Sequence, residues 1–157
     1  MIKLTRSTVL EHPIDRVWAV LRDFNGHDRW HPAVAQSHLE RGRPTDAVGC
    51  VRNFRLADGA QLREQLLELS DATATLRYCL LDTPVPLLNY VARIQLVPVT
   101  DGNLTFWEWS CQFDTLAGLA DQMKDMVGKQ IYEAGFAAVA RLLDEQAASH
   151  HTKDRDS

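Results

Sequence analysis

Two charged residues stand at positions where the sequence pattern calls for apolar side chains. The even positions of 49–57 and 60–70 are largely apolar, and Arg52 and Glu64 share those positions. Side chains alternate between the two faces of a strand, so both residues should point inward. A buried carboxylate without a partner is very costly. We therefore predict that Arg52 and Glu64 approach each other as a structural ion pair, or that Glu64 meets a ligand, a water or a tyrosine.

His31 is the next residue that could do chemistry, since the pKa of an unperturbed histidine lies near neutrality. It could act as general acid or base beside a carbonyl group, as a cyclising or dehydrating enzyme needs. Alternatively, it only caps the corner between a helix and a strand. His27 and His31 are four residues apart and resemble half of a zinc site. Gly26 and Pro32 bracket this segment and no third ligand is evident, so we predict no metal.

Tyrosines and tryptophans recur among the residues that should face inward, and buried tyrosine hydroxyls need hydrogen-bond partners. Around one cavity they would suit a flat, mostly apolar, partly oxygenated molecule. The predicted ligand-binding residues are His31, Arg52, Phe54, Leu56, Glu64, Leu66, Tyr78, Leu80, Leu87, Tyr90, Trp109, Gly128 and Tyr132. His31 and Glu64 are also the candidate catalytic residues. No phosphate-binding glycine loop or serine nucleophile elbow is present, and no cofactor is predicted.

The elements that must position these residues follow from period and turn chemistry. Alternating segments predict strands at 2–11, 33–41, 49–57, 60–70, 73–82, 87–99 and 103–113. Two short helices follow the first strand, the first starting at Pro13 and the second closing at Pro32. Consecutive strands with short turns imply an antiparallel sheet with helices on one side. The predicted fold class is α+β, with a curved seven-stranded antiparallel sheet around a long C-terminal helix.

Apolar residues spaced by three and four predict that last helix, from about 115 to 145. Gly128 and Gly135 are seven apart and should share one side of it. A glycine inside a helix costs about 1 kcal/mol relative to alanine. The two glycines either allow close packing of the helix on the sheet or leave room for a ligand. The small, polar segment 147–157 predicts a disordered tail, so the single domain should span 1–146.

Composition limits the classes of partner. The 157 residues suit one domain, and the net charge of −4 without a Lys/Arg run argues against nucleic acid. No apolar stretch is long enough to insert across a membrane. The chain starts without a secretory signal, and its three cysteines lack metal-type spacing. These features predict reduced thiols and a cytoplasmic location.

Six segments, in their order along the chain, carry a resemblance to a known superfamily. They are Pro13 to Phe24, Val48-Gly49-Cys50-Val51-Arg52, Arg63-Glu64-Gln65-Leu66, Leu87-Leu88-Asn89-Tyr90, Trp109-Ser110-Cys111-Gln112-Phe113-Asp114 and Ile131-Tyr132-Glu133-Ala134-Gly135. Over about residues 3–145 the chain resembles the START-like helix-grip (SRPBCC) superfamily. That superfamily includes polyketide cyclase/dehydrase-like proteins, birch-pollen-allergen-like carriers and plant abscisic acid receptors, so one scaffold serves enzymes, carriers and receptors.

The resemblance to the abscisic acid receptors implies roles for individual residues. His31 stands where those receptors have a lysine that meets the ligand carboxylate, and Glu64 matches a glutamate of their polar ligand network. Tyr90 matches the tyrosine of their Asn-Tyr motif. The receptor gate sequence is absent at 57–60, and residues 85–87 replace the latch His-Arg-Leu. The resemblance therefore implies a pocket and leaves the hormone-gated switch unsupported.

The leading hypothesis is a protein that binds a small, mostly apolar, partly oxygenated ligand in an internal cavity between the sheet and the C-terminal helix. One alternative is a polyketide cyclase or dehydratase, with His31 or Glu64 as the proton-transfer group. The other is a non-catalytic module that recruits another protein through the latch loop. The expected partner is a small hydrophobic molecule.

Overall fold

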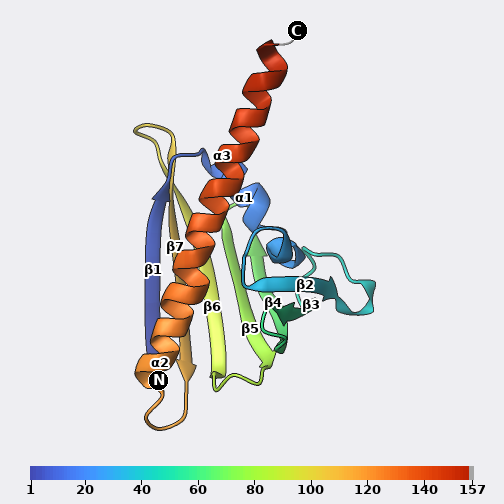
Figure 1. The fold of residues 1–157 in the computed structure, drawn as a ribbon, viewed down its shortest axis with the longest axis vertical. Helices are drawn as coiled ribbons and strands as arrows, with labels where there is room; N and C mark the ends of the chain where they lie inside the picture. Colours follow the sequence, from blue (N-terminus) through green and yellow to red (C-terminus); the bar gives the residue numbers. More distant parts are fainter. Residues whose placement is uncertain (156–157) are drawn as a thin grey trace.

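Seven strands and a long C-terminal helical segment make up the fold, which we describe from a computed structural model for residues 1–155 (Figure 1). In chain order the elements are β1 (Ile2–Leu10), α1 (Ile14–Leu21), η1 (Phe24–Arg29), β2 (Val34–Leu39), η2 (Glu40–Gly42), β3 (Val51–Leu56), β4 (Gln61–Ser70), β5 (Thr75–Asp82), β6 (Leu88–Val99), β7 (Leu104–Asp114), α2 (Ala120–Asp125), η3 (Met126–Glu133) and α3 (Ala134–Arg155).

All seven strands form one antiparallel sheet in the order β1-β7-β6-β5-β4-β3-β2. The C-terminal helical segment lies across one face of that sheet, and α1 with η1 connects β1 to the opposite edge (Figure 1). The predicted fold class is therefore confirmed. Short turns join the strands from β3 onward, which is why the sequence pattern located them within a few residues.

Alternation along the strands determines which side chains are buried. On β7, Trp107 and Trp109 are 0% and 4% exposed, and they point toward the helical segment. The Trp109 ring stacks on Tyr132 with 4.3 Å between centroids, and Trp107 meets Phe136 edge-on at 4.7 Å. We call these four residues the aromatic core. They join η3 and α3 to the sheet, as the inward parity predicted.

The helical segment differs from the single helix predicted over 115–145. Residues 115–119 are not helical, and η3 between α2 and α3 is a π-helix, in which each hydrogen bond spans five residues instead of four. The two glycines differ in what lies beside them. A Cβ on Gly128 would lie 2.8 Å from Nη2 of Arg6, and one on Gly135 would lie 2.8 Å from Cζ3 of Trp109. Close packing on the sheet therefore accounts for Gly135, whereas Gly128 faces the end of the flexible Arg6 side chain.

The helix also runs farther than predicted. α3 continues to Arg155, so residues 147–155 are helical although the sequence predicts a disordered tail there. Residues 156–157 of that tail lie outside the described residues. The segment contains alanines and charged residues with good helix propensity and neither glycine nor proline, so nothing local stops the helix. Figure 1 shows this end of α3 projecting past the sheet. Within residues 1–155, no helix is long and apolar enough to cross a membrane.

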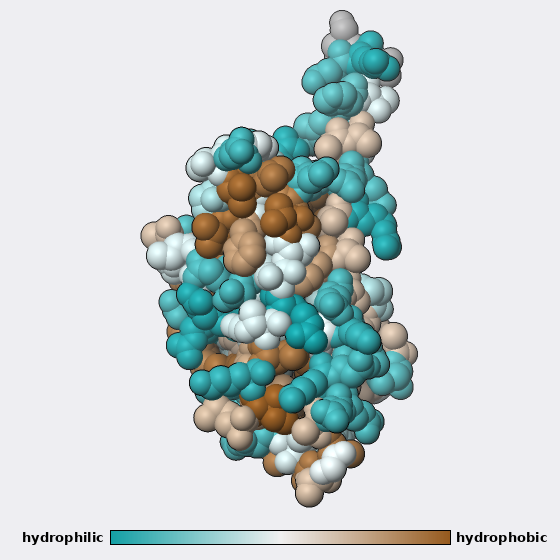
Figure 2. All heavy atoms as spheres, turned by 90° about the vertical axis from the view of Figure 1, so that its left-hand side faces the viewer, coloured by the Kyte–Doolittle hydropathy of each residue, from teal (hydrophilic) through white to brown (hydrophobic). Residues whose placement is uncertain are grey.

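The outer face of the sheet is not uniformly polar. Val9 and Val97 are 51% and 45% exposed, and both pair with Phe106, so the three form a row across β1, β7 and β6. Seen from the β1 side, apolar residues gather in the upper half of the molecule (Figure 2). The inner face, by contrast, carries the core and the candidate site.

Candidate functional site

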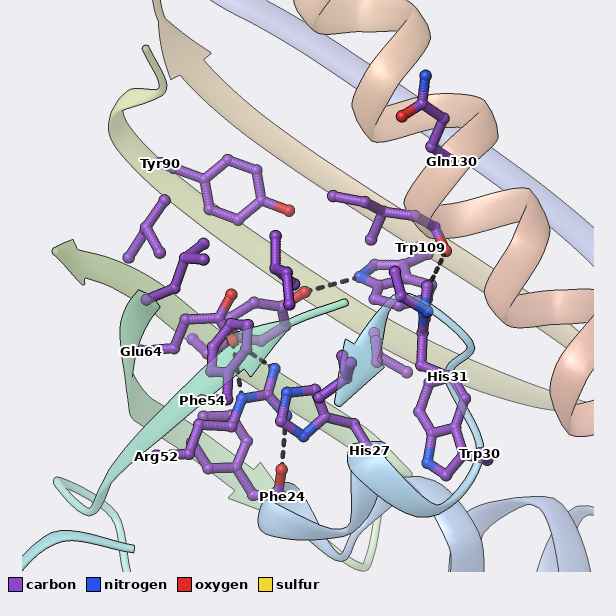
Figure 3. Close-up of a pocket in the computed structure, with 18 of the residues that line it drawn as sticks. Phe24, His27, Trp30, His31, Arg52, Phe54, Glu64, Tyr90, Trp109 and Gln130 are labelled. Carbon is purple, nitrogen blue, oxygen red and sulfur yellow. Dashed lines mark hydrogen bonds and ion pairs between the residues drawn. The ribbon is translucent and has the colours of Figure 1, made fainter. Parts of the chain in front are cut away.

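A pocket of about 300 Å3 lies between the inner face of the sheet, η1 and η3 (Figure 3). Inward positions of β3 to β7 supply its floor, and Met126, Gln130 and Ile131 of η3 supply one wall. Ten of the predicted ligand-binding residues line it: His31, Arg52, Phe54, Leu56, Glu64, Tyr78, Leu80, Leu87, Tyr90 and Trp109. The structure thus brings predicted residues from five strands together around one pocket.

Three predicted residues do not line the pocket. Leu66 is fully buried in the core, and Tyr132 lies beneath Trp109 in the aromatic core. Gly128 faces Arg6 of β1 at the other edge of the sheet. Strand parity and helix period identify which residues face inward. They do not distinguish a filled interior from an open one, which is why these three were included.

Arg52 and Glu64 form a buried ion pair at the floor of the pocket. They are directly opposite each other in the pairing of β3 with β4, and each is 8% exposed. Arg52 donates from Nε to Oε2 of Glu64 at 2.7 Å and also from Nη2 to the same oxygen. The predicted approach is confirmed. Burial raises the pKa of the Glu64 carboxyl, while the charge and hydrogen bonds of Arg52 oppose that rise.

Arg52 is also held from the side of η1. Its Nη1 donates to the backbone carbonyl of Phe24 at 2.5 Å, and its guanidinium lies over the Phe24 ring, 4.0 Å from the centroid. The cation is therefore bonded to a carboxylate and a carbonyl and covered by an aromatic face. Such a cation positions the neighbouring elements and has little capacity left to attract an anion.

His31 has both ring nitrogens engaged by backbone groups. Nε2 donates to the carbonyl of Ile131 at 2.7 Å, and Nδ1 accepts from the backbone N–H of Ala33 at 3.1 Å. These bonds set the neutral tautomer with hydrogen on Nε2. Burial is the main cause that lowers the pKa of His31, and the nearby Arg52 adds to it. His31 thus fixes the end of η1 to η3, as the corner-capping interpretation expects.

His27 is a pocket residue that the sequence reasoning did not identify. It is 7% exposed, and its ring packs edge-on against Phe54 with 4.7 Å between centroids. Neither ring nitrogen makes a hydrogen bond. Burial is the main cause that lowers the pKa of His27 well below its ordinary value, and the charges of Arg52 and His31 lower it further. A contact with the Asn25 backbone acts to raise this pKa, but it does not have the geometry of a hydrogen bond.

The only sequence signal for His27 was its spacing of four from His31, which resembles half of a zinc site but led us to predict no metal. Among residues 1–155, no group of three histidine, cysteine, aspartate or glutamate side chains could hold a metal ion. The two histidines instead lie in and just after the 3-10 helix η1, where both reach the pocket. A turn of this kind has no hydrophobic period from which inward positions can be identified.

Buried hydroxyls complete the inner wall. The Tyr78 hydroxyl accepts from Nε1 of Trp109 at 3.1 Å, and the hydroxyls of Tyr90 and Tyr132 are 2.6 Å apart. Burial raises the pKa of all three phenols, so they stay protonated near neutrality. They offer hydrogen bonds without charge.

Loops close the remaining sides of the pocket. Ala57 and Asp58 of the β3–β4 turn line it, as do Val85 and Leu87 before β6. Further lining residues outside the predicted set include Leu21, Asp23, Phe24, Trp30, Ala33, Val34, Leu62, Leu76 and Ile94. The lining is thus mainly apolar and aromatic.

Comparison with known proteins agrees with this fold. The family described as polyketide cyclase/dehydrase and lipid transport matches residues 1–144. An uncharacterized protein from Bacillus thuringiensis is 27% identical, with a TM-score of 0.80, over 90% of this chain and 98% of its own.

Two further solved structures are similar. The protein XoxI from Bacillus cereus is 28% identical, with a TM-score of 0.79, over 93% of this chain and 99% of its own. A protein from Thermobifida fusca is 30% identical, with a TM-score of 0.78, over 89% of this chain and 91% of its own. A search of curated proteins found no match.

Proposed function

The chain belongs to the polyketide cyclase/dehydrase and lipid transport family, and on that premise we propose that it binds a small, mostly apolar, partly oxygenated molecule in the pocket between the sheet and η3. One observation carries the proposal: a pocket of about 300 Å3 lies beside the buried hydrophobic core. Its volume and its apolar lining with a few polar groups are typical of ligand sites.

The state of the candidate catalytic groups favours binding over catalysis. Both nitrogens of His31 are committed to backbone groups, so proton transfer by His31 would require breaking a bond that joins η1 to η3. Glu64 is held by two hydrogen bonds from Arg52. These residues support the site's shape more directly than they offer a free proton-transfer group.

One observation supports a cyclase or dehydratase as the second candidate. The Glu64 carboxylate lines the pocket, and burial moves its pKa toward the range that proton transfer requires. If the protein is such an enzyme, Glu64→Gln should bind the substrate but lose roughly 100- to 10,000-fold in rate. A binding protein should show no turnover with or without this substitution.

The binding proposal can be tested with a pair of substitutions on β5. Leu80 lines the pocket, whereas its neighbour Leu81 is 43% exposed on the other face. Naphthalene serves as the probe, and its affinity is measured by equilibrium dialysis. Leu80→Trp should fill the pocket and weaken naphthalene binding by at least about tenfold, a change of roughly 1.4 kcal/mol. Leu81→Trp adds the same ring outside and should bind as the wild type does.

Circular dichroism should show that both variants keep the fold. The proposal is contradicted if the wild type does not bind naphthalene, or if a folded Leu80→Trp variant binds it unchanged.

A further inference from the structure

The buried polar atoms without hydrogen bonds gather at the pocket. Among residues 1–155, four such side-chain atoms occur: Nδ1 and Nε2 of His27, and the indole Nε1 of Trp30 and of Trp107. His27 and Trp30 both line the pocket, whereas Trp107 belongs to the aromatic core. Buried polar groups are nearly always paired in folded proteins, so each exception calls for a reason.

His27 is the strongest of these exceptions because its whole polar capacity is unused. A neutral imidazole has one N–H donor and one nitrogen acceptor, and neither has a partner. Several polar groups near it are paired: His31 with backbone groups, Tyr78 with Trp109, and Arg52 with Glu64. Figure 3 shows the His27 ring beside Arg52 and Phe54 in the pocket. His27 therefore lines the pocket with its hydrogen-bonding capacity unused.

The charges of the lining indicate what kind of group that is. The lining contains a single lysine or arginine, Arg52, against three acidic residues: Asp23, Asp58 and Glu64. Arg52 is already paired with Glu64, and Asp23 with Arg29. An anionic ligand would meet no unpaired cation and would lie close to the Glu64 carboxylate. Burying an unpaired charge is costly, so the lining favours an uncharged molecule.

We propose that His27 is a ligand-binding residue that hydrogen bonds a hydroxyl group of an uncharged, hydroxylated aromatic ligand. A hydroxyl can both donate and accept, so it matches a neutral imidazole whose two nitrogens are both unpaired. Six aromatic side chains of the lining offer ring surfaces to such a ligand: Phe24, Trp30, Phe54, Tyr78, Tyr90 and Trp109. This assignment rests on the proposed binding function and specifies the chemistry of the ligand.

Three probes of similar shape test it: naphthalene, 2-naphthol and 2-naphthoate, with affinity measured by equilibrium dialysis near pH 7. The wild type should bind 2-naphthol at least tenfold more tightly than naphthalene, and 2-naphthoate more weakly than 2-naphthol. His27→Phe keeps a ring against Phe54 but has no nitrogen. It should lose the tenfold preference for 2-naphthol over naphthalene, which is compared within the same variant.

Three further variants control for folding and for the loss of any histidine. His27→Gln retains a donor and an acceptor and should keep part of the preference for 2-naphthol. His27→Leu, which also has no nitrogen, replaces His27→Phe if that variant does not fold. His38 is an exposed residue of β2, and His38→Phe should bind all three probes as the wild type does.

Each contrary result has a distinct meaning. If naphthalene binds but His27→Phe keeps the preference for 2-naphthol, or weakens both probes equally, His27 is not the hydroxyl-binding residue and the assignment fails alone. Tighter binding of 2-naphthoate than of 2-naphthol would also overturn it, since it would reveal an available cation. If none of the probes binds the wild type, both the assignment and the proposed function fail.

Discussion

The aromatic core and the pocket are built from the same inner face of one sheet, yet they treat polar atoms differently. In the core, the Tyr132 hydroxyl finds Tyr90 at 2.6 Å, and rings fill the space beneath η3 and α3. In the pocket, by contrast, space remains open, and the ring nitrogens of His27 make no hydrogen bond. Among residues 1–155, three of the four buried side-chain atoms without a hydrogen bond lie at the open pocket, on His27 and Trp30, and the fourth is the indole Nε1 of Trp107 in the core.

Trp109 shows how closely the two regions adjoin. Its ring stacks on Tyr132 in the core, while the residue also lines the pocket and donates to the Tyr78 hydroxyl. Tight packing on one side of this ring fixes the wall on the other. The core therefore supplies a rigid boundary for the pocket, and substitutions can test the two regions separately.

The largest effect is expected where the pocket depends on a buried charge pair. Arg52→Leu should lower the free energy of unfolding by about 3–5 kcal/mol, because it leaves the Glu64 carboxylate buried without its partner. The double variant Arg52→Leu/Glu64→Leu should recover most of that loss. Urea unfolding measures both. A loss below about 1 kcal/mol in the single variant would mean that water already solvates the pair, as it does surface pairs.

A smaller effect should distinguish the two glycines of the helical segment. Gly135→Ala places a methyl group 2.8 Å from the buried Trp109 ring and should cost about 1–3 kcal/mol, as overpacking does. Gly128→Ala meets only the end of the flexible Arg6 side chain and should be neutral or stabilising by up to about 1 kcal/mol. Thermal or urea unfolding compares them. Equal losses would show that the core packs no more tightly than the edge.

The smallest effect is a pH dependence that originates at the pocket. The fold lowers the pKa of His27, whereas a histidine of the unfolded chain has a pKa near 6.5. Between about pH 7 and pH 5.5, the unfolded chain therefore binds a proton at His27 that the folded chain does not. Stability should therefore fall as pH decreases below about 6.5, by at most ~1.4 kcal/mol per pH unit for this group. His31 contributes in the same direction.

His27→Phe should make this pH dependence shallower, as measured by urea unfolding at several pH values. The exposed His38→Phe is the control and should keep the wild-type slope. If the free energy of unfolding of His27→Phe changes with pH as steeply as that of the wild type, then His27 takes up its proton as readily in the folded chain as in the unfolded chain.

The sequence predicted the sheet well because alternation and turn residues are local signals. Arg52 and Glu64 could be paired from sequence alone, since both interrupt an inward apolar row. His27 could not, because a 3-10 turn carries no such row. The π-helical winding of η3 also has no signature in apolar spacing, and the extension of α3 to Arg155 depends on propensities that polar composition obscures.

The π-helical segment has a consequence for how the chain can change in length. A π turn contains one residue more than an α turn, so deleting one exposed residue of η3, such as Lys129, can convert that turn to α-helix. The faces of α2 and α3 that pack on the sheet then stay in place. The same deletion inside α3 would rotate all later residues by about 100° around the helix axis. Residues 126–133 are therefore where this helical segment can lose a residue and still fit its sheet.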